Sequence, residues 1–490
     1  MKIYRLQSGE QFTEELTQIL EQCKNEAAKI IFSEGVYVLQ KGIVLTNEHQ
    51  GLSFEAEGEV HLRGAVPLTN FQKADGQIRV YDLSEEGSPG ISPFVSRGFG
   101  RYMEPGHSEL FVDGEPLNLS QYPKGNDFVT IAGVEHGKEI FPGKEAGPLE
   151  AGFYCTDEHL KAWQKKENIW VLGYWMWDWA PTIENIESYE AETGKLLMKE
   201  PYGVYEYCKG QRLRFYNIPE EITEPGEYCI DIENKKVYVY PPKENEIWMS
   251  VLKEPLVQIE GSREISFRGF TFEMTCGIAL EANYCEGLSV KDCTLKNIGS
   301  AAINVLEGHD IHIENNTIHD CGDSGVILCG GNRCTLEPMR ANVDNNHIYR
   351  IGKWTKCYQV GIHLHGVGMN ARHNLIHDLP HTGIMFWGNE IHIEDNEIFR
   401  VLLESGDAGA IYTGRDYTYR GNRICHNYIH HVGNSCDITN GIYNDDCVSG
   451  TVMKDNYLEE IENGMLLGGG RDFLAENNVF VNCDTAIYFD

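Results

Sequence analysis

Paired carboxylates are the strongest chemical signal in this 490-residue sequence. Asp407 precedes a Gly-Ala-Ile-Tyr run, and Asp445 and Asp446 end a Gly-Ile-Tyr-Asn run about 38 residues later. Each run is typical of a short β-strand, because β-branched and aromatic residues stand between turn residues. Two carboxyl groups held roughly 5 to 9 Å apart suit hydrolysis of a glycosidic bond. We therefore expect Asp407 and Asp445 to form a catalytic pair, with Asp446 as the alternative to Asp445.

The same acids also have an ordinary structural explanation. Asp before Gly is common in turns, and Asp-Asp at a strand end can cap the following loop. Each acid taken alone is better explained in this way. Their occurrence beside two aligned tyrosines, Tyr412 and Tyr443, favours catalysis. The sequence leaves open which acid would protonate the leaving group and whether the anomeric configuration is retained.

Polar and aromatic residues around the acids are expected to bind a saccharide. Arg415 and Glu404 are suited to orienting a carboxylate or a sugar hydroxyl, and Trp387 to stacking on a pyranose ring. The expected substrate-binding residues are Glu404, Arg415, Trp387, Tyr412, Tyr443, His365 and His381. The histidines are better explained as loop or groove residues than as metal ligands, so we expect no metal and no cofactor.

An asparagine repeat predicts the element that positions these residues. The pattern is an apolar residue, two residues, Asn, one residue and a second apolar residue. It recurs at Asn316, Asn346, Asn374, Asn396, Asn427, Asn456 and Asn478, at spacings of 22 to 31 residues. Short strands with this period predict a solenoid, and the 22-residue minimum suits one three-strand coil. We expect each Asn to occupy a left-handed corner and to hydrogen-bond the Asn of the next coil.

A second strand in each coil begins with Gly or another small residue. Because side chains alternate across a strand, the isoleucines of these strands and the polar residues beside them should face opposite sides. The residues expected on one outer ridge are His363, His365, Met385, Trp387, Tyr412, Tyr443 and Asp445. A ridge of this composition over neighbouring coils is a plausible saccharide groove.

The remaining segments suggest three regions. Residues 1–65 should form an N-terminal cap and the first coils, with an amphipathic helix over residues 8–28 and a capping box at Ser8 and Gln11. Residues 66–250 read as an inserted, mainly antiparallel β module with turns at Asp113-Gly114 and near Asn234. The aromatic run at 170–179 is better explained as module core than as a sugar-stacking wall. Residues 251–490 carry the repeat. We therefore predict an all-β fold, a right-handed parallel β-helix with an inserted module and a capping helix.

Composition and net charge limit the classes of molecule that the protein is expected to bind. The formal net charge of −33 disfavours nucleic acid and anionic membranes, because both need a basic surface. The N-terminus lacks the pattern of a signal peptide, and the 15 cysteines show no CxxC pairing, so we expect free thiols and a cytoplasmic protein. The expected partner is an oligosaccharide. The last repeat strand has no obvious cap, which leaves a missing C-terminal portion or a homo-oligomer open.

Several motifs resemble a known family. The stretches PHTGIMFWGN, ESGDAGAIYTGRDYTYRGN and GIYNDDCVSG look like the right-handed parallel β-helix enzymes of glycoside hydrolase family 141. ELFVDGEPLNLSQYP, WVLGYWMWDWA and EPGEYCIDIENKKVYVYPP look like the β module of that group. Family 120 β-xylosidases are more distantly similar. The resemblance implies hydrolysis of fucosides or xylans, and catalytic acids at the motifs that hold Asp407 and Asp445-Asp446.

The leading hypothesis is thus a glycoside hydrolase acting on plant-type oligosaccharides of the xyloside, fucoside or arabinoside class. A polysaccharide lyase is one alternative, but the sequence shows no basic groove. A non-catalytic carbohydrate-binding β-helix is another, and it would need no paired acids.

Overall fold

A computed structural model describes residues 2–73, 76–164, 166–433 and 438–490. The chain forms two compact units. The first comprises Met1–Gly64 and Leu252–Asp490, and the second is the segment Ala65–Val251.

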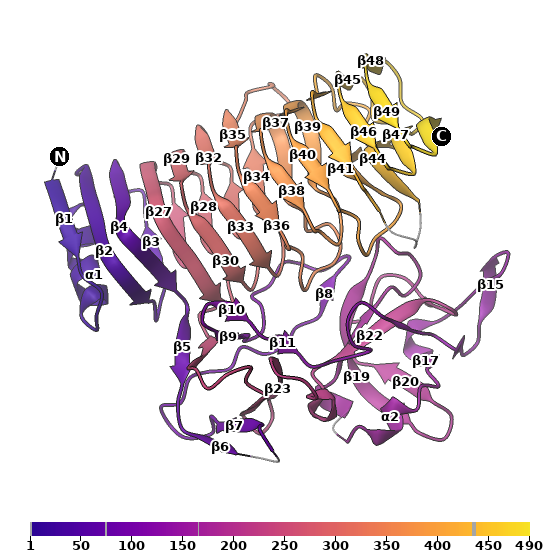
Figure 1. The fold of residues 1–490 in the computed structure, drawn as a ribbon. Coiled ribbons are helices and arrows are strands. Elements are labelled where there is room, and N and C mark those ends of the chain that lie inside the picture. Colours follow the sequence, from indigo (N-terminus) through magenta and orange to yellow (C-terminus); the bar gives the residue numbers. More distant parts are fainter. Residues whose placement is uncertain (1, 74–75, 165, 434–437) are drawn as a thin grey trace. The chain divides into compact units, whose positions relative to one another are not determined.

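The first unit is a parallel β-helix whose coils each add one strand to three parallel ladders (Figure 1). The first ladder contains β2 (Ala28–Val38), β4 (Leu52–Arg63), β27 (Arg263–Thr275), β29 (Glu286–Lys291), β32 (Ile311–Glu314), β35 (Ala341–Asp344), β37 (Ile362–Arg372), β39 (Ile384–Glu394), β42 (Arg423–Cys425), β45 (Val452–Lys454) and β48 (Leu474–Glu476). The second contains the end of β27 and β30 (Thr294–Ile298), β33 (Thr317–Cys321), β36 (His347–Tyr349), β38 (Leu375–His377), β40 (Glu397–Phe399), β43 (Tyr428–His430), β46 (Tyr457–Glu459) and β49 (Val479–Val481).

The third ladder carries the predicted ridge. It contains β3 (Ile43–Leu45), β26 (Val257–Glu260), β28 (Leu280–Asn283), β31 (Ile303–Leu306), β34 (Val326–Gly330), the starts of β37 and β39, β41 (Ala408–Gly414), β44 (Thr439–Asp445), β47 (Asn463–Leu467) and β50 (Thr485–Phe489). The all-β, parallel β-helix prediction is confirmed.

Aliphatic columns fill the interior of the coils. In the second ladder, Ile348, Ile376, Ile398 and Ile429 are in register on successive coils and fully buried. Burying each such side chain stabilises the fold by about 1.5–3 kcal/mol. The sequence forms these strands because every second residue can enter this core while its neighbour faces outward.

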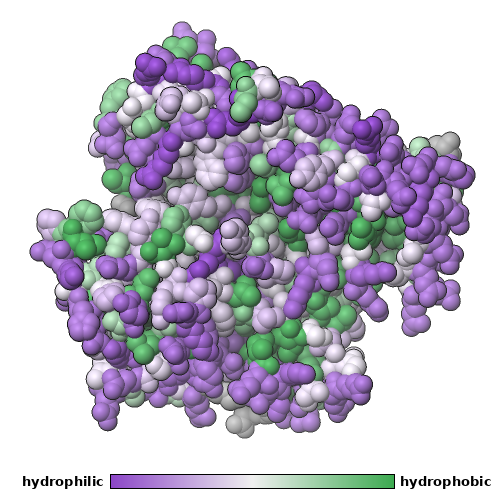
Figure 2. Space-filling view, turned by 180° about the vertical axis from the view of Figure 1, so that it is seen from behind, coloured by the Kyte–Doolittle hydropathy of each residue, from purple (hydrophilic) through white to green (hydrophobic). Residues whose placement is uncertain are grey.

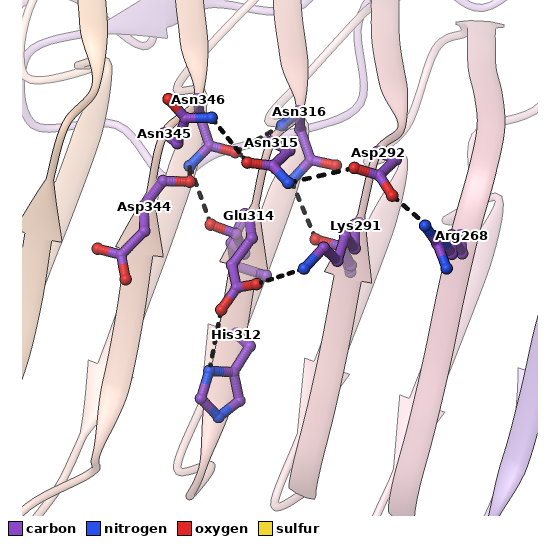
Figure 3. A network of polar contacts seen from close by, with 12 residues as sticks. Arg268, Lys291, Asp292, His312, Glu314, Asn315, Asn316, Asp344, Asn345 and Asn346 are labelled. Carbon is purple, nitrogen blue, oxygen red and sulfur yellow. Dashed lines mark hydrogen bonds and ion pairs between the residues drawn. The ribbon is translucent and has the colours of Figure 1, made fainter.

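The repeated asparagines form a buried ladder at one corner. Each side-chain amide donates to the Oδ1 atom of the Asn one coil further on, at 2.9 to 3.0 Å from Asn316 through to Asn478. The same Oδ1 atoms accept the backbone N–H of the preceding Asn. Figure 3 shows the start of this ladder at Asn316 and Asn346, with Asn315 and Asn345 in a second, outer row.

The backbone at this corner differs from the prediction. The left-handed residue is the one before each ladder Asn, such as Asn315, Asn345 and Asp395, with φ of 55 to 58°. The ladder asparagines themselves are not among the residues with positive φ. The chain turns at the residue before the ladder Asn. The ladder Asn then points inward, with its side-chain amide directed along the axis on which the coils stack.

The N-terminal helix is shorter than predicted. β1 (Lys2–Leu6) pairs with β2, and α1 (Phe12–Gln22) follows with Phe12 and Leu16 buried against the first coils. Gln11 is the N-cap residue and makes no side-chain capping bond, so the predicted capping box is wrong. Ser8 packs beside Gly35 instead, and Ala28 already belongs to β2.

The second unit is mainly antiparallel. β9 (Leu110–Val112) and β10 (Glu115–Pro116) turn at Asp113-Gly114, and β23 (Glu227–Asp231) and β24 (Lys236–Val239) form the other predicted hairpin. Within the aromatic run, Trp175 is fully buried and packs edge-on against Tyr207. This part of the run therefore belongs to the unit's core.

An aromatic stack lies on the outer face of the second ladder. His319, Tyr349, His377, Phe399 and His430 stack with ring centroids 4.8 to 5.2 Å apart. At its centre, Arg400 donates two hydrogen bonds of 2.6 Å to Asp378, and His377 contacts the same carboxylate at 2.7 Å. The Arg400 guanidinium and His377 lower the pKa of Asp378 to about 2.

We expect the substitution Asn396→Ala to lower the free energy of unfolding by about 3 kcal/mol, because it leaves the buried N–H groups of Asn374 without an acceptor. The half-buried Asn370, which donates to Asn342 on the outer face, is the matched control. Asn370→Ala should cost less than about 1 kcal/mol. Urea denaturation of both variants checks this, and equal losses would contradict the ladder's role.

Stability should fall in acid through the Asp378 pair. The pKa of Asp378 is lower in the folded state than the unfolded value of roughly 4, so its contribution is present above pH 4 and is lost as the pH falls towards about 2. Asp378→Asn should reduce the fall in the free energy of unfolding between pH 4 and about 2 by about 0.5–1 kcal/mol, since the pair is partly exposed. Arg400→Gln should have the same effect in urea titrations at several pH values. A profile that neither variant changes would refute this assignment.

Candidate active site

An outer-face cluster on the third ladder surrounds the predicted acids. The register aligns Met385 of β39 with Tyr412 of β41 and Tyr412 with Tyr443 of β44. These three side chains are buried together with Val360 and Leu466, separately from the core of the coils. The isoleucines between them point inward, as the alternation requires.

Asp445 accepts three hydrogen bonds from neighbouring groups. Its Oδ2 accepts from the Tyr412 hydroxyl at 2.8 Å, and its Oδ1 accepts from the Tyr443 hydroxyl at 3.2 Å and from the Asp446 backbone N–H at 2.8 Å. Arg415 Nε lies 3.4 Å from Oδ2. All these groups are donors, and together they stabilise a negative charge on Asp445.

Tyr443 connects Asp445 with Asp407. Its hydroxyl oxygen lies 3.0 Å from Asp407 Oδ1 and 3.2 Å from Asp445 Oδ1. The two acids lie on neighbouring coils but are not register partners. Asp445 pairs with Gly414, whereas Asp407 precedes β41 and its N–H donates to Ile438. A bend of the chain and the length of the tyrosine side chain bring the carboxylates together.

Two glycines make this arrangement possible. A Cβ atom at Gly409 would lie 2.7 Å from Tyr443 Cβ and 2.8 Å from the Ile411 carbonyl oxygen. A Cβ atom at Gly414 would lie 2.8 Å from the Tyr412 hydroxyl and 3.0 Å from Asp445 Cβ. Gly409 therefore allows β41 to pack closely against Tyr443, and Gly414 leaves room for Tyr412 to reach Asp445.

Asp446 has a different environment. Its side chain is 59% exposed, against 13% for Asp445, and its contact is with Arg415 Nη2 at 3.5 Å. It does not share the tyrosine hydroxyls. The geometry thus separates two adjacent acids that the sequence could not distinguish.

The other expected binding residues lie in varied surroundings. Glu404 forms an ion pair with Lys356 at 2.9 Å, both largely buried. His381 is 2% exposed, neither ring nitrogen has a hydrogen-bond partner among the described residues, and burial lowers its pKa to about 3. Its ring lies 5.2 Å from that of Tyr358. His381 is thus a neutral, enclosed side chain in this structure.

Trp387 is partly exposed at the side of the cluster. The His363 and His365 rings meet it edge-on, with centroids 4.8 and 5.7 Å away. Burial lowers the pKa of His363 to about 4, so this support is uncharged near neutral pH. The two histidines hold the indole in a fixed orientation.

The tyrosine hydroxyls have raised pKa values. Burial, followed by the neighbouring carboxylates, raises the pKa of Tyr443, and burial raises the pKa of Tyr412 and Tyr358. Both hydroxyls at the acids therefore remain protonated donors at all moderate pH values.

Sequence reasoning missed three residues near the acids. Lys356 and Tyr358 lie in the loop between β36 and β37, where Tyr358 feels the charges of Asp407 and Asp445. Arg333, in the loop between β34 and β35, donates to Asn389 and Thr418 and contacts Asp416, so it fixes the loop that follows Arg415. The one available signal was the long Asn-to-Asn spacings of 30 and 28 residues, which indicate rim loops.

The described residues contain no group of three or more His, Cys, Asp or Glu side chains arranged to hold a metal ion. The cysteines among them are free thiols; Cys293 and Cys425 are buried, and Cys483 is half-buried. No helix in this part of the chain is long and apolar enough to cross a bilayer. The face in Figure 2 is largely hydrophilic, with scattered hydrophobic residues.

Comparisons with known proteins agree with the fold. Residues 255–353 match the model of a right-handed β-helix region. A solved structure described as "Glycoside hydrolase" has a TM-score of 0.71 at 14% identity, covering 98% of this chain and 96% of that one. The structure of XylC in complex with xylose has a TM-score of 0.47 at 14% identity; the match covers 96% of this chain and 69% of that one. An exopolygalacturonase from Thermotoga maritima gives 0.40 at 12% identity, covering 95% and 87%. No curated protein sequence matches the chain.

These findings define the chain as a right-handed parallel β-helix protein. Structural similarity at 14% identity concerns the fold. What the site does has to be argued from its own residues.

We expect Gly409→Ala to destabilise the protein by about 1–3 kcal/mol, because its Cβ atom would meet two backbone-anchored neighbours. Gly414→Ala, at the other end of the same strand β41, is the matched variant. It should cost less than Gly409→Ala, since its nearest contact is the end of the Tyr412 side chain at 2.8 Å and its nearest backbone-anchored atom, Asp445 Cβ, is 3.0 Å away. Urea denaturation compares the two, and the reverse order would contradict the close packing of Gly409 against Tyr443.

Proposed function

We propose that the protein is a retaining glycoside hydrolase acting on neutral plant-type oligosaccharides. The observation that carries this proposal is the Tyr443 hydroxyl, which lies 3.0 and 3.2 Å from the two carboxylates. Since both contacts reach one oxygen atom, Asp407 Oδ1 and Asp445 Oδ1 are at most about 6 Å apart. Inverting enzymes hold their carboxyl groups roughly 6.5–9.5 Å apart, and retaining enzymes about 5–5.5 Å.

The surroundings of the acids support a division of roles. Asp445 accepts hydrogen bonds from two tyrosines and a backbone N–H beside Arg415, which favours an ionised nucleophile. Asp407 is exposed, so a leaving group and a water molecule can reach it. We assign Asp445 as the nucleophile and Asp407 as the acid and base. Asp446, outside the shared hydrogen bonds, is not part of this pair.

Two features of the site favour a neutral sugar as substrate. Arg415 and Lys356 are already paired with the carboxylates of Asp445 and Glu404, which favours a neutral sugar over a uronate. The partly exposed Trp387 ring suits stacking on a pyranose. The resemblance to family 141 supports xylosides or fucosides, with arabinosides as the near alternative. The similar fold described as "Glycoside hydrolase" supports the reaction class.

A panel of aryl xylosides, fucosides, arabinosides and galactosides tests the activity. Asp407→Asn and Asp445→Asn should each lower kcat for the hydrolysed substrate by at least about 1,000-fold. Asp446→Asn is the matched control and should keep activity within roughly tenfold of wild type. Release of unsaturated sugars that absorb in the ultraviolet would point to a lyase instead. No hydrolysis of any glycoside in the panel would overturn the proposal.

The stereochemical course is a separate prediction. Proton NMR of the first product formed should show the same anomer as the substrate, before mutarotation mixes the two forms. Initial appearance of the opposite anomer would mean that the carboxyl groups act by inversion. In that case the hydrolase could stand, but the roles given to Asp445 and Asp407 would be wrong.

A further inference from the structure

We propose that Tyr443 is a catalytic residue whose hydroxyl hydrogen moves between Asp445 and Asp407 as the negative charge moves between them. This inference rests on the proposed glycosidase function and deepens it. The Tyr443 hydroxyl oxygen lies 3.0 Å from Asp407 Oδ1 and 3.2 Å from Asp445 Oδ1. The sequence had suggested only that Tyr443 binds substrate.

A phenol has one hydrogen, which limits how both contacts can be satisfied. The hydroxyl donates to one carboxylate and offers only lone pairs to the other. Two ionised carboxylates cannot both be stabilised by it at this distance. The arrangement is satisfied when one carboxyl group is protonated and donates to the Tyr443 oxygen, while Tyr443 donates to the other.

The neighbours decide which acid carries that proton. Asp445 faces the Tyr412 hydroxyl, the Asp446 N–H and Arg415, which are all donors to a negative charge. We place the proton on Asp407, whose exposed carboxyl group can pass it to a leaving group, so that Asp407 donates to the Tyr443 oxygen and Tyr443 donates to Asp445. In the resting site, Asp407 is thus protonated as the general acid and Asp445 is ionised as the nucleophile.

Catalysis then reverses this hydrogen-bond chain. In the first step, the Asp407 proton passes to the glycosidic oxygen as the bond from that oxygen to C1 breaks, and an oxygen of Asp445 forms the new bond to C1. Asp445 is now an uncharged ester and Asp407 is ionised. The Tyr443 hydroxyl rotates to donate to Asp407 and stabilises the new charge.

The second step restores the resting protonation states of the two acids. A water proton passes to Asp407 while the water oxygen binds C1 and the bond from C1 to Asp445 breaks. The charge returns to Asp445, and the Tyr443 hydrogen returns with it. No proton is lost from Tyr443 at any stage, which agrees with the upward shift of its pKa.

The site is built to keep this hydroxyl in place. The Tyr443 ring is buried and meets the Tyr412 ring edge-on at 5.3 Å, and its Cβ atom packs closely against Gly409. Among the described residues, the titratable and charged groups around this hydroxyl and the two acids are Asp407, Asp445, Asp446, Arg415, Tyr412 and Tyr358. Only the two aspartates are within hydrogen-bond distance of its oxygen in the part of the chain that the structure describes.

The test is the pH dependence of kcat/KM for Tyr443→Phe, measured with the aryl glycoside that the wild type hydrolyses. We expect kcat to fall about 10- to 100-fold, because one donor to each developing charge is lost. The bell-shaped profile should also narrow by about one pH unit on each side. Its acid limb should move up because Asp445 loses a donor, and its alkaline limb should move down because the Asp407 proton loses its acceptor.

A matched control is available on another ladder. Tyr428 donates to Glu459 of the next coil at 2.7 Å, and Tyr428→Phe should leave both kcat and the profile unchanged. Tyr412→Phe should move only the acid limb, since that hydroxyl contacts Asp445 alone. Thermal unfolding of each variant verifies that the fold is intact.

The outcomes separate the two proposals. A wild type without glycosidase activity refutes the proposed function. An active wild type whose Tyr443→Phe variant folds and keeps the width of its pH profile overturns the role of Tyr443 while leaving the hydrolase in place. A profile that shifts on the acid limb alone would likewise overturn the exchange with Asp407.

Discussion

The buried asparagine ladder is the interaction on which the rest of the structure depends. Each amide is removed from water and satisfied only by the coil next to it, so a coil that slipped by one residue would leave buried donors unpaired. Such a slip would also turn every outward side chain to the interior. The ladder thereby fixes the vertical alignment of residues that are 22 to 31 positions apart in sequence. An active site assembled from several coils requires that alignment.

Register alone does not bring the acids together, however. Strict stacking would have placed Asp445 above Gly414 and Asp407 beside Ile438, at opposite ends of their strands. The site instead uses a local departure from regular geometry, the left-handed bend at Asp407 just before β41, and a side chain long enough to reach both acids. After this bend β41 pairs with β44 along its length, whereas it shares only two partners with β39.

This division explains what the sequence predicted and what it did not. The Asn repeat and the alternation around Ile362, Ile384, Ile411 and Ile442 follow directly from coil geometry, so the fold and the residues of the outer ridge could be read from their spacing. The left-handed corner was assigned one residue late, because sequence periodicity does not distinguish the turn from the residue that follows it. Lys356, Tyr358 and Arg333 lie in irregular rim loops, whose contacts no periodic pattern encodes.

The tyrosines illustrate the same limit in chemical terms. Tyr412 and Tyr443 were expected to face a sugar because they alternate with buried isoleucines, yet their hydroxyls are directed at the carboxylates. Two acids within about 6 Å repel each other when both are ionised, and an apolar neighbour would only increase that repulsion. A buried phenol between them relieves it with a hydrogen that either acid can receive. The burial of Met385 and Val360 around the rings excludes water, which would otherwise replace the phenol and weaken its coupling to both charges.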